Sequence, residues 1–147
     1  FIFKFLKYME KFKNNFISFT IKGEILFLNI ENSINPSEKE FNQFLEWWKL
    51  IFEEFMNKPF FMIINIENLI MVNRYYIIRW IDTFKKYNHL IEKNVIATSV
   101  ICSSIIAKTM LDLFFVFYTP VKPTKIFKKD EDYSQFFKEE YNKSLRK

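Results

Sequence analysis

The chain has 147 residues, of which half are hydrophobic and one fifth aromatic, and it carries a formal net charge of +5. Such a length and aromatic content suit one domain with a buried core and exclude a disordered chain. The 22 basic residues are scattered among 17 acidic ones, which argues against the concentrated basic face of a nucleic-acid-binding protein. The single cysteine, Cys102, cannot form an intrachain disulfide, so we expect a reducing, cytoplasmic location.

Residues 1–15 are predicted to be an amino-terminal tail or upstream extension. The segment 1–12 is rich in Phe but has Lys every few positions, so it lacks the apolar core of a signal peptide. Met9 is a candidate start, and removal of residues 1–8 is expected to leave the melting temperature nearly unchanged. A basic aromatic anchor at a membrane surface is the alternative for this segment. No window of the chain has 18 uninterrupted apolar residues, so no transmembrane segment is predicted.

Residues 16–145 are predicted to form a single domain that begins with a β-hairpin. Alternating polarity over Phe16–Ile21 and the apolar run Ile25–Ile30 predict two strands around the only glycine. Ser37 and Glu40 have the spacing of a capping box, which predicts the start of a helix. The buried stripe of this helix is expected to consist of Phe41, Phe44, Leu45, Trp48, Phe52 and Phe55.

A strand, a polar turn and a second helix follow in the stretch Phe60–Ile81. The apolar run Phe60–Ile66 begins directly after a proline and predicts a strand covered on both faces. Asn73 is placed to cap a helix that continues to about Glu92, and Lys93-Asn94 is expected to be a turn.

The last third of the chain predicts two more strand–helix units. Val95–Cys102 is a β-branched strand, and Ser103 is placed to cap the next helix. The buried face of that helix is expected to contain Ile106, Met110, Leu113, Phe114 and Phe117. Thr124–Phe127 is a short strand, and Asp130 is placed to cap a final helix. The buried stripe of the final helix is expected to be Tyr133, Phe136, Phe137 and Tyr141.

The predicted element order is β-β-α-β-α-β-α-β-α. This order predicts an α/β fold with a mostly parallel mixed sheet and helices packed on it. Over about Phe16 to Tyr141 it resembles the STAS domain, the SpoIIAA-like fold of bacterial anti-sigma factor antagonists and of the cytoplasmic ends of sulfate transporters. CRAL-TRIO-like lipid-binding domains have a similar topology.

The local resemblance is sharpest over residues 64–77. The STAS pattern there is L-D-L-S-x-V-x-x-I-D-S-S-G-L, and it aligns with this chain without a gap. The regulated Ser of the antagonist proteins falls on Tyr75, the preceding Ser on Arg74, and the Gly on Tyr76. The resemblance therefore implies the fold and a regulatory, protein-binding role, without a switch operated by a Ser-directed kinase.

The residue constellations of most enzymes are missing. His89 is the only histidine, so a Ser-His-Asp triad or a His-based metal site would depend on it. The only glycine lies in the predicted hairpin, which leaves no Gly-rich phosphate loop. The acidic pairs Glu53-Glu54 and Glu139-Glu140 are helix neighbours whose side chains diverge by about 100°. We therefore predict no enzymatic activity, no metal and no cofactor.

A candidate site is expected where the carboxyl ends of the parallel strands meet the amino ends of the helices. The residues predicted to form this partner-binding site are Asn65, Glu67, Asn68, Asn73, Arg74, Tyr75, Ser103 and Ser104. Asn73 and Ser103 are equally explained as helix caps, whereas Arg74 and Tyr75 are not.

The prediction is a non-enzymatic STAS-like module that binds another protein, with its oligomeric state open. The alternative is a CRAL-TRIO-like carrier of a lipid or small ligand, which would use the aromatic residues to line a pocket. Such a carrier requires a connected apolar pocket of several hundred Å³.

Overall fold

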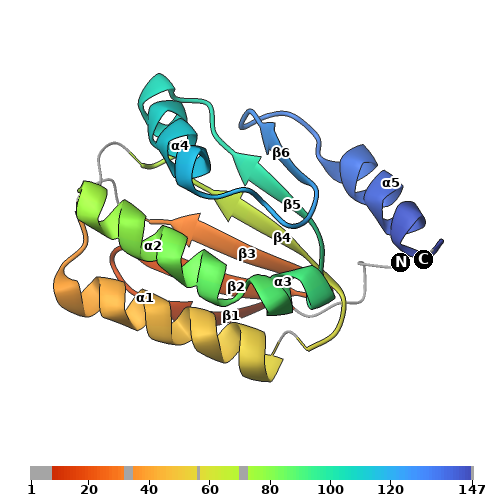
Figure 1. Cartoon of the computed structure of the whole chain (residues 1–147), viewed down its shortest axis with the longest axis horizontal. Coiled ribbons are helices and arrows are strands. Elements are labelled where there is room, and N and C mark those ends of the chain that lie inside the picture. The colour runs from red at the N-terminus through yellow and green to blue at the C-terminus, as the bar shows by residue number, and fades with distance from the viewer. Residues whose placement is uncertain (1–7, 32–34, 56, 70–72, 147) are drawn as a thin grey trace.

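The computed structural model of the protein describes residues 8–31, 35–55, 57–69 and 73–146. Six strands form one sheet whose spatial order is the chain order (Figure 1). The strands are β1 (Tyr8–Lys13), β2 (Ile17–Lys22), β3 (Ile25–Ile30), β4 (Phe60–Asn65), β5 (Val95–Ile101) and β6 (Thr124–Phe127). The α-helices are α1 (Glu38–Leu50), α2 (Arg74–Lys86), α3 (Asn88–Asn94), α4 (Ile105–Phe117) and α5 (Ser134–Ser144), and a π-helical turn, Ile51–Phe55, extends α1.

The sheet is antiparallel at its amino-terminal side and parallel elsewhere. β1 pairs with β2, and β2 with β3, in antiparallel fashion, whereas β3, β4, β5 and β6 pair in parallel. Gly23 makes the β2–β3 turn with a φ of 58°, a value at which a side chain would be strained. The predicted mixed, mostly parallel α/β sheet is confirmed.

The winding of the chain determines which face each helix covers. From β3 to β6, each connection leads to the next strand in the same direction across the sheet. Because such connections are right-handed, their helices all lie on the same face of the sheet. Figure 1 shows α1, α2 and α4 on that face. Helix α5 packs on the other face, where the rings of Phe61 and Phe137 stack 4.5 Å apart. Because the strand order never reverses, the sheet lacks the switch point at which adjacent crossover helices usually separate to open a crevice.

Helix α1 is built as its sequence predicts. Ser37 accepts from the Glu40 backbone N–H, and the Glu40 side chain accepts from the Ser37 N–H, which completes the capping box. Phe44 and Trp48 are fully buried, and the Phe44 ring lies 5.9 Å from that of Phe19 on β2. Phe41 and Phe52 are buried and Leu45 is half-buried, while the side chain of Phe55 lies outside the described part of the chain.

The expectation that residues 1–15 precede the fold is wrong for Tyr8–Lys13, because these residues form β1. The Phe12 ring stacks on that of Trp47 at 5.4 Å, which ties the strand to α1. The register shifts between Glu10 and Phe12, and such a bulge breaks the alternation by which a strand is recognised. Residues 1–7 lie outside the described residues.

Two further boundaries differ from the prediction. The helix expected to run to Glu92 breaks at Tyr87, whose φ and ψ are −101° and 10°, and α3 then includes Lys93-Asn94 in place of the expected turn. The final helix begins at Ser134, and Asp132, not Asp130, accepts a hydrogen bond from the Ser134 N–H at 2.8 Å. Asp132 lies two residues before Ser134, which is the spacing of an Asx turn, in which a side-chain carboxylate accepts from the backbone N–H two residues later. Asp130 lies four residues before Ser134 and does not have this spacing. The predicted buried stripe of the final helix, α5, is confirmed, with Phe137 buried and Tyr133, Phe136 and Tyr141 packed beside it.

Helix α4 differs most from its prediction. Ser104, not Ser103, caps it. Its buried residues are Ala107 and Leu111, and the predicted Met110, Leu113 and Phe114 are partly buried against the core beside them. Ile106 and Phe117, expected to be buried, are about half exposed. The observed inner face lies one residue, or about 100°, away from the predicted one. Since this helix is apolar on nearly every side, its hydrophobic pattern does not specify which side faces the sheet.

Candidate functional site

The predicted site lies at the carboxyl ends of the parallel strands. Figure 1 shows the first turns of α1, α2 and α4 at the end of the sheet toward which the arrows of β3, β4 and β5 point. The predicted site residues belong to the end of β4, the β4–α2 connection, the start of α2 and the β5–α4 connection. The sheet thus brings all eight predicted residues to one end of the molecule, where several of them make hydrogen bonds that hold the connections in place.

The β4–α2 connection begins as a tight turn. The Asn65 side-chain oxygen accepts from the Glu67 N–H at 2.9 Å, and the Ile66 N–H donates to the Ile101 carbonyl at 3.0 Å. The Asn68 side-chain amide donates to the Ile30 carbonyl at 3.3 Å, which joins the turn to the end of β3. Asn65 and Asn68 therefore shape the site more than they offer groups to a partner.

Glu67 has a different environment. Its Oε1 atom is buried and has no hydrogen-bond partner within the described part of the chain. Burial raises the pKa of the neighbouring Cys102 thiol, and the negative charge of Glu67 raises it further. Cys102 is buried and its Sγ contacts the Ser104 carbonyl at 3.7 Å, so the thiol is a packed core group and not a nucleophile.

The start of α2 confirms Asn73 as its cap. The Asn73 side-chain oxygen accepts from the Tyr75 N–H at 2.9 Å, and the Asn73 N–H donates to the Asn35 side chain at 2.7 Å. Residues 70–72, which complete the connection, lie outside the described residues.

Arg74 and Tyr75 point to solvent from the first turn of α2. The Tyr75 side chain is 53% exposed, and its ring contacts that of Tyr76 at 5.3 Å in an edge-on arrangement. Arg74 is exposed and makes no ion pair or hydrogen bond with any residue that the structure describes. No cap or core contact accounts for these two side chains.

Arg79 supports this surface, although the sequence analysis did not select it. Its guanidinium lies 5.2 Å from the centre of the Tyr75 ring and 4.8 Å from that of Phe41. The same group donates to Glu38 at 2.9 Å and to Asn42 at 2.6 Å, so it joins α2 to α1. The i, i+4 spacing of Tyr75 and Arg79 was the signal that could have revealed the contact.

The two serines after β5 are both occupied by backbone groups. The Ser104 hydroxyl accepts from the Ala107 N–H at 2.9 Å and caps α4. The Ser103 hydroxyl accepts from the Lys129 N–H at 2.8 Å and so holds the β6–α5 connection. The expectation that Ser103 caps the helix is wrong because Ser104 is the residue directly before the first turn.

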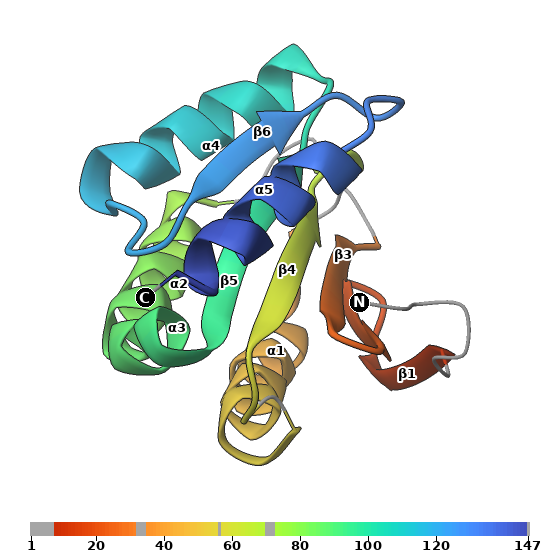
Figure 2. The same cartoon turned by 90° about the vertical axis from the view of Figure 1, so that its right-hand side faces the viewer.

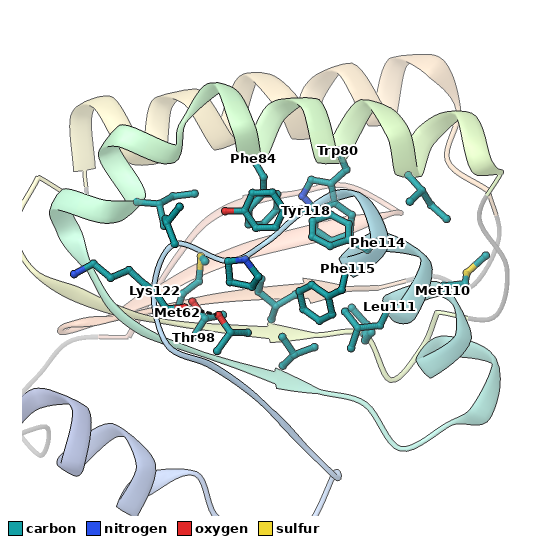
Figure 3. Close-up of a pocket in the computed structure, with 18 of the residues that line it drawn as sticks. Met62, Trp80, Phe84, Thr98, Met110, Leu111, Phe114, Phe115, Tyr118 and Lys122 are labelled. Carbon is teal, nitrogen blue, oxygen red and sulfur yellow. Dashed lines mark hydrogen bonds between the residues drawn. The ribbon is translucent and has the colours of Figure 1, made fainter.

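A small apolar cavity of about 70 Å³ lies between α2, α4 and the sheet (Figure 3). Trp80, Phe84, Phe114 and Tyr118 line one side of it, and Met62 and Thr98 lie on the sheet beneath. The Tyr118 hydroxyl donates to the Asn88 side chain at 2.8 Å, and burial raises the pKa of Tyr118 to about 12. Since a drug-sized ligand needs roughly 300 Å³ or more, this cavity is too small for one. A second hollow of about 580 Å³ beside α5 is open and partly polar, with Lys22, Lys138 and Asn142 in its lining, so it is not the enclosed apolar pocket of a lipid carrier.

The residues that the structure describes include neither a metal site nor a membrane-spanning helix. Among the described residues, no three His, Cys, Asp or Glu side chains are grouped so that they could hold a metal ion. The only histidine, His89, is exposed on α3. Within the same part of the chain, no helix is long and apolar enough to cross a membrane.

Comparison with known proteins identifies the fold. No family model matches the chain, and no curated protein matches it. A solved structure, that of an uncharacterised protein of the DUF3478 family from Shewanella loihica PV-4 described as having a SpoIIAA-like fold, is similar with a TM-score of 0.54. The similarity covers 85% of this chain and 90% of that chain at 12% sequence identity. The fold is therefore SpoIIAA-like, that is, STAS-like, as predicted.

Proposed function

We propose that the protein is a non-enzymatic, STAS-like regulatory module that binds another protein in the cytoplasm through the surface at the start of α2. The observation that carries this proposal is the exposed Tyr75 ring, which lies against the Arg79 guanidinium. Arg and Tyr are the residues that most often anchor protein interfaces, because they offer large, rigid contact surfaces together with hydrogen-bond donors.

The geometry of the surface favours a protein over a small molecule. The sheet has no switch-point crevice at this end, and the described cavity of about 70 Å³ lies beneath α2 and α4. An exposed ring on a helix start suits a broad contact with a folded partner better than enclosure of a metabolite. The side-chain oxygen and backbone N–H of Asn73 are already paired, so we assign contact with the partner to Arg74 and Tyr75.

The position of Tyr75 also argues that binding is regulated differently from binding by the antagonist proteins, which is controlled through phosphorylation of a Ser. It occupies the place at which the resembling family has its phosphorylated Ser, so a Ser-directed kinase has no target there. We infer that binding through this surface does not depend on Ser phosphorylation and is set by the Arg74 and Tyr75 side chains themselves.

The test compares partner capture by the native chain and by the double variant Arg74→Ala with Tyr75→Ala, followed by mass spectrometry of proteins from the native source. We expect the double variant to capture the partner about tenfold less well or worse, a loss of roughly 1.4 kcal/mol in binding. Because both side chains are exposed, the melting temperature should move by only a few degrees.

The matched control changes Lys85→Ala and Lys86→Ala, two exposed residues at the far end of the same helix. Equal capture by both double variants would show that the start of α2 is not the binding surface. Unfolding of the Arg74 and Tyr75 variant would instead assign the pair to the structural support of α1 and α2.

A further inference from the structure

The outward side of α4 carries several large apolar side chains, and nothing in the described part of the chain covers them. Ile105 is 85% exposed and Val116 72% exposed, at opposite ends of the helix. Ile106 and Phe117 are each about half exposed beside them. Figure 2 shows α4 at the outside of the molecule beside β6. Large apolar side chains that gather on an exposed helix face are typical of an interaction site, so this face is expected to have a partner.

We propose that the partner is a second copy of the chain, with α4 packed antiparallel against the other α4 across a two-fold axis. Ile105 and Val116 are separated by eleven residues, about three helical turns, so they lie on one line along the outer face. A two-fold axis perpendicular to that line and midway between them places Ile105 against the Val116 of the other copy, and the reverse.

The charged groups of the face are complementary in the same arrangement. Lys108 and Asp112 are both exposed, and within one chain their Nζ and Oδ1 atoms are 3.5 Å apart. Across the two-fold axis, Lys108 of one copy lies within about 1.5 Å, along the helix axis, of Asp112 of the other copy. Each chain thus offers one positive and one negative group to the opposite groups of its neighbour.

The side chains on the two flanks of α4 are also compatible with this two-fold arrangement. Helical periodicity places Lys108 and Asp112 on one flank of the Ile105–Val116 line, and the exposed Ile106 and Phe117 on the other. Because the two-fold axis is perpendicular to both helices and lies between them, each flank of one copy lies beside the same flank of the other copy. Apolar side chains therefore meet apolar ones, and the charged flank meets charges of opposite sign.

Charge favours a second copy over the other occupants of an apolar face. The chain carries a net charge of +5, yet the outer face of α4 has one Lys and one Asp and is neutral. A neutral face gives no attraction to an anionic membrane or an acidic protein, and it lets two basic molecules approach with less repulsion. The adjacent edge strand β6 carries the exposed Lys125, a residue type that discourages pairing between sheet edges.

The size of the face predicts a reversible dimer. A standard interface takes about 20–30 residues from each partner, whereas α4 has 13 residues and only its outer side is free. The exposed Val121 and Ile126 beside it enlarge the apolar surface modestly. We therefore expect a dimer that dissociates in the micromolar range.

Sedimentation of the purified chain from about 1 to about 200 µM tests the proposal. The native chain should shift from monomer to dimer with concentration, and Ile105→Asp with Val116→Asp should remain monomeric throughout. Lys108→Asp alone and Asp112→Lys alone should each weaken association about tenfold or more. An equimolar mixture of these two variants should recover association, because each then supplies the charges that the other needs. Lys138→Asp, the same charge change at an exposed position of α5, should leave the dimer unchanged.

Three outcomes would overturn the proposal. The first is a native chain that is monomeric at every concentration, and the second is a dimer that the mixture of charge variants fails to restore. The third is binding of a monomeric native chain to vesicles of phosphatidylcholine and phosphatidylserine that the Ile105 and Val116 variant loses, which would assign the face to a membrane surface. Should a charge variant not fold, Thr109→Arg, at an exposed position near the centre of the same face, must weaken the dimer in its place.

Discussion

Tyr118 is the residue for which the structure makes the sharpest prediction about pH. Its hydroxyl is buried and bonded to Asn88, and its pKa is raised from 10.0 to about 12. The folded state therefore holds this proton more tightly than the unfolded state, so the stability that the neutral phenol contributes is complete below pH 10 and is lost as the pH rises toward 12. We expect the free energy of unfolding to decline over this range, and to decline less steeply in Tyr118→Phe.

Denaturant unfolding at a series of pH values measures both slopes. Tyr87 and Tyr133 also have pKa values raised by burial, so the slope should shrink in Tyr118→Phe without vanishing. Identical slopes for the native chain and Tyr118→Phe would show that folding does not raise the pKa of Tyr118.

Among the site residues, those defined by local chemistry were predictable and those defined by tertiary contact were not. Asn73 precedes the periodic part of α2, and its capping role follows from its position. Arg79 acquires its role only when α1 and α2 lie side by side, because Glu38 and Asn42 are 41 and 37 residues away along the chain. A sequence pattern restricted to one helix contains no information about that pairing.

At the level of elements, the start of α4 offers a matched pair of serines. Ser104→Ala removes the side-chain acceptor of the Ala107 N–H and should cost about 1 kcal/mol in the free energy of unfolding, as the loss of a helix cap usually does. Ser103→Ala removes the acceptor of the Lys129 N–H, at an exposed connection where water can replace it. Chemical denaturation should therefore rank Ser104→Ala as the more damaging change. The reverse ranking would mean that the β6–α5 connection, and not the cap, limits stability.

The buried face of a helix was predicted well where its apolar residues form a single stripe, and poorly where they surround most of the helix. The stripe of α1 leaves one choice of inner face, and the structure confirms it with Phe44 and Trp48 fully buried. Helix α4 has apolar residues around most of its circumference, so several rotations of the helix bury similar surface and only the sheet decides between them. β1 was missed because its bulge removes the alternation on which strand recognition depends.

For the whole molecule, the addition of β1 changes what truncation should do. A chain that begins at Tyr8 keeps all six described strands, and we expect its melting temperature to stay within a few degrees of that of the full chain. A chain that begins at Asn14 loses β1, exposes the edge of β2 and removes the stacking of Phe12 on Trp47. We expect it to melt many degrees lower or to be insoluble, because a long unpaired edge strand promotes aggregation.

Differential scanning calorimetry of the two truncated chains measures the contrast. A large loss already in the chain that begins at Tyr8 would mean that the first seven residues are needed for stability. Equal melting temperatures for the full chain and the chain that begins at Asn14 would show that β1 contributes little to the sheet.

The spatial order of the strands, which repeats their order along the chain, also bears on how the molecule is assembled during synthesis. Each strand from β2 to β6 pairs with the strand made just before it, so a nascent chain can extend its sheet as residues leave the ribosome without reserving a gap for a later segment. Helix α5 is the exception, because it returns to pack on Phe61 of β4. Until α5 is made, the apolar patch formed by Ile25, Phe61, Ile63 and Ala97 has no helix over it, and this late stage is when a ribosome-associated chaperone would have most to protect.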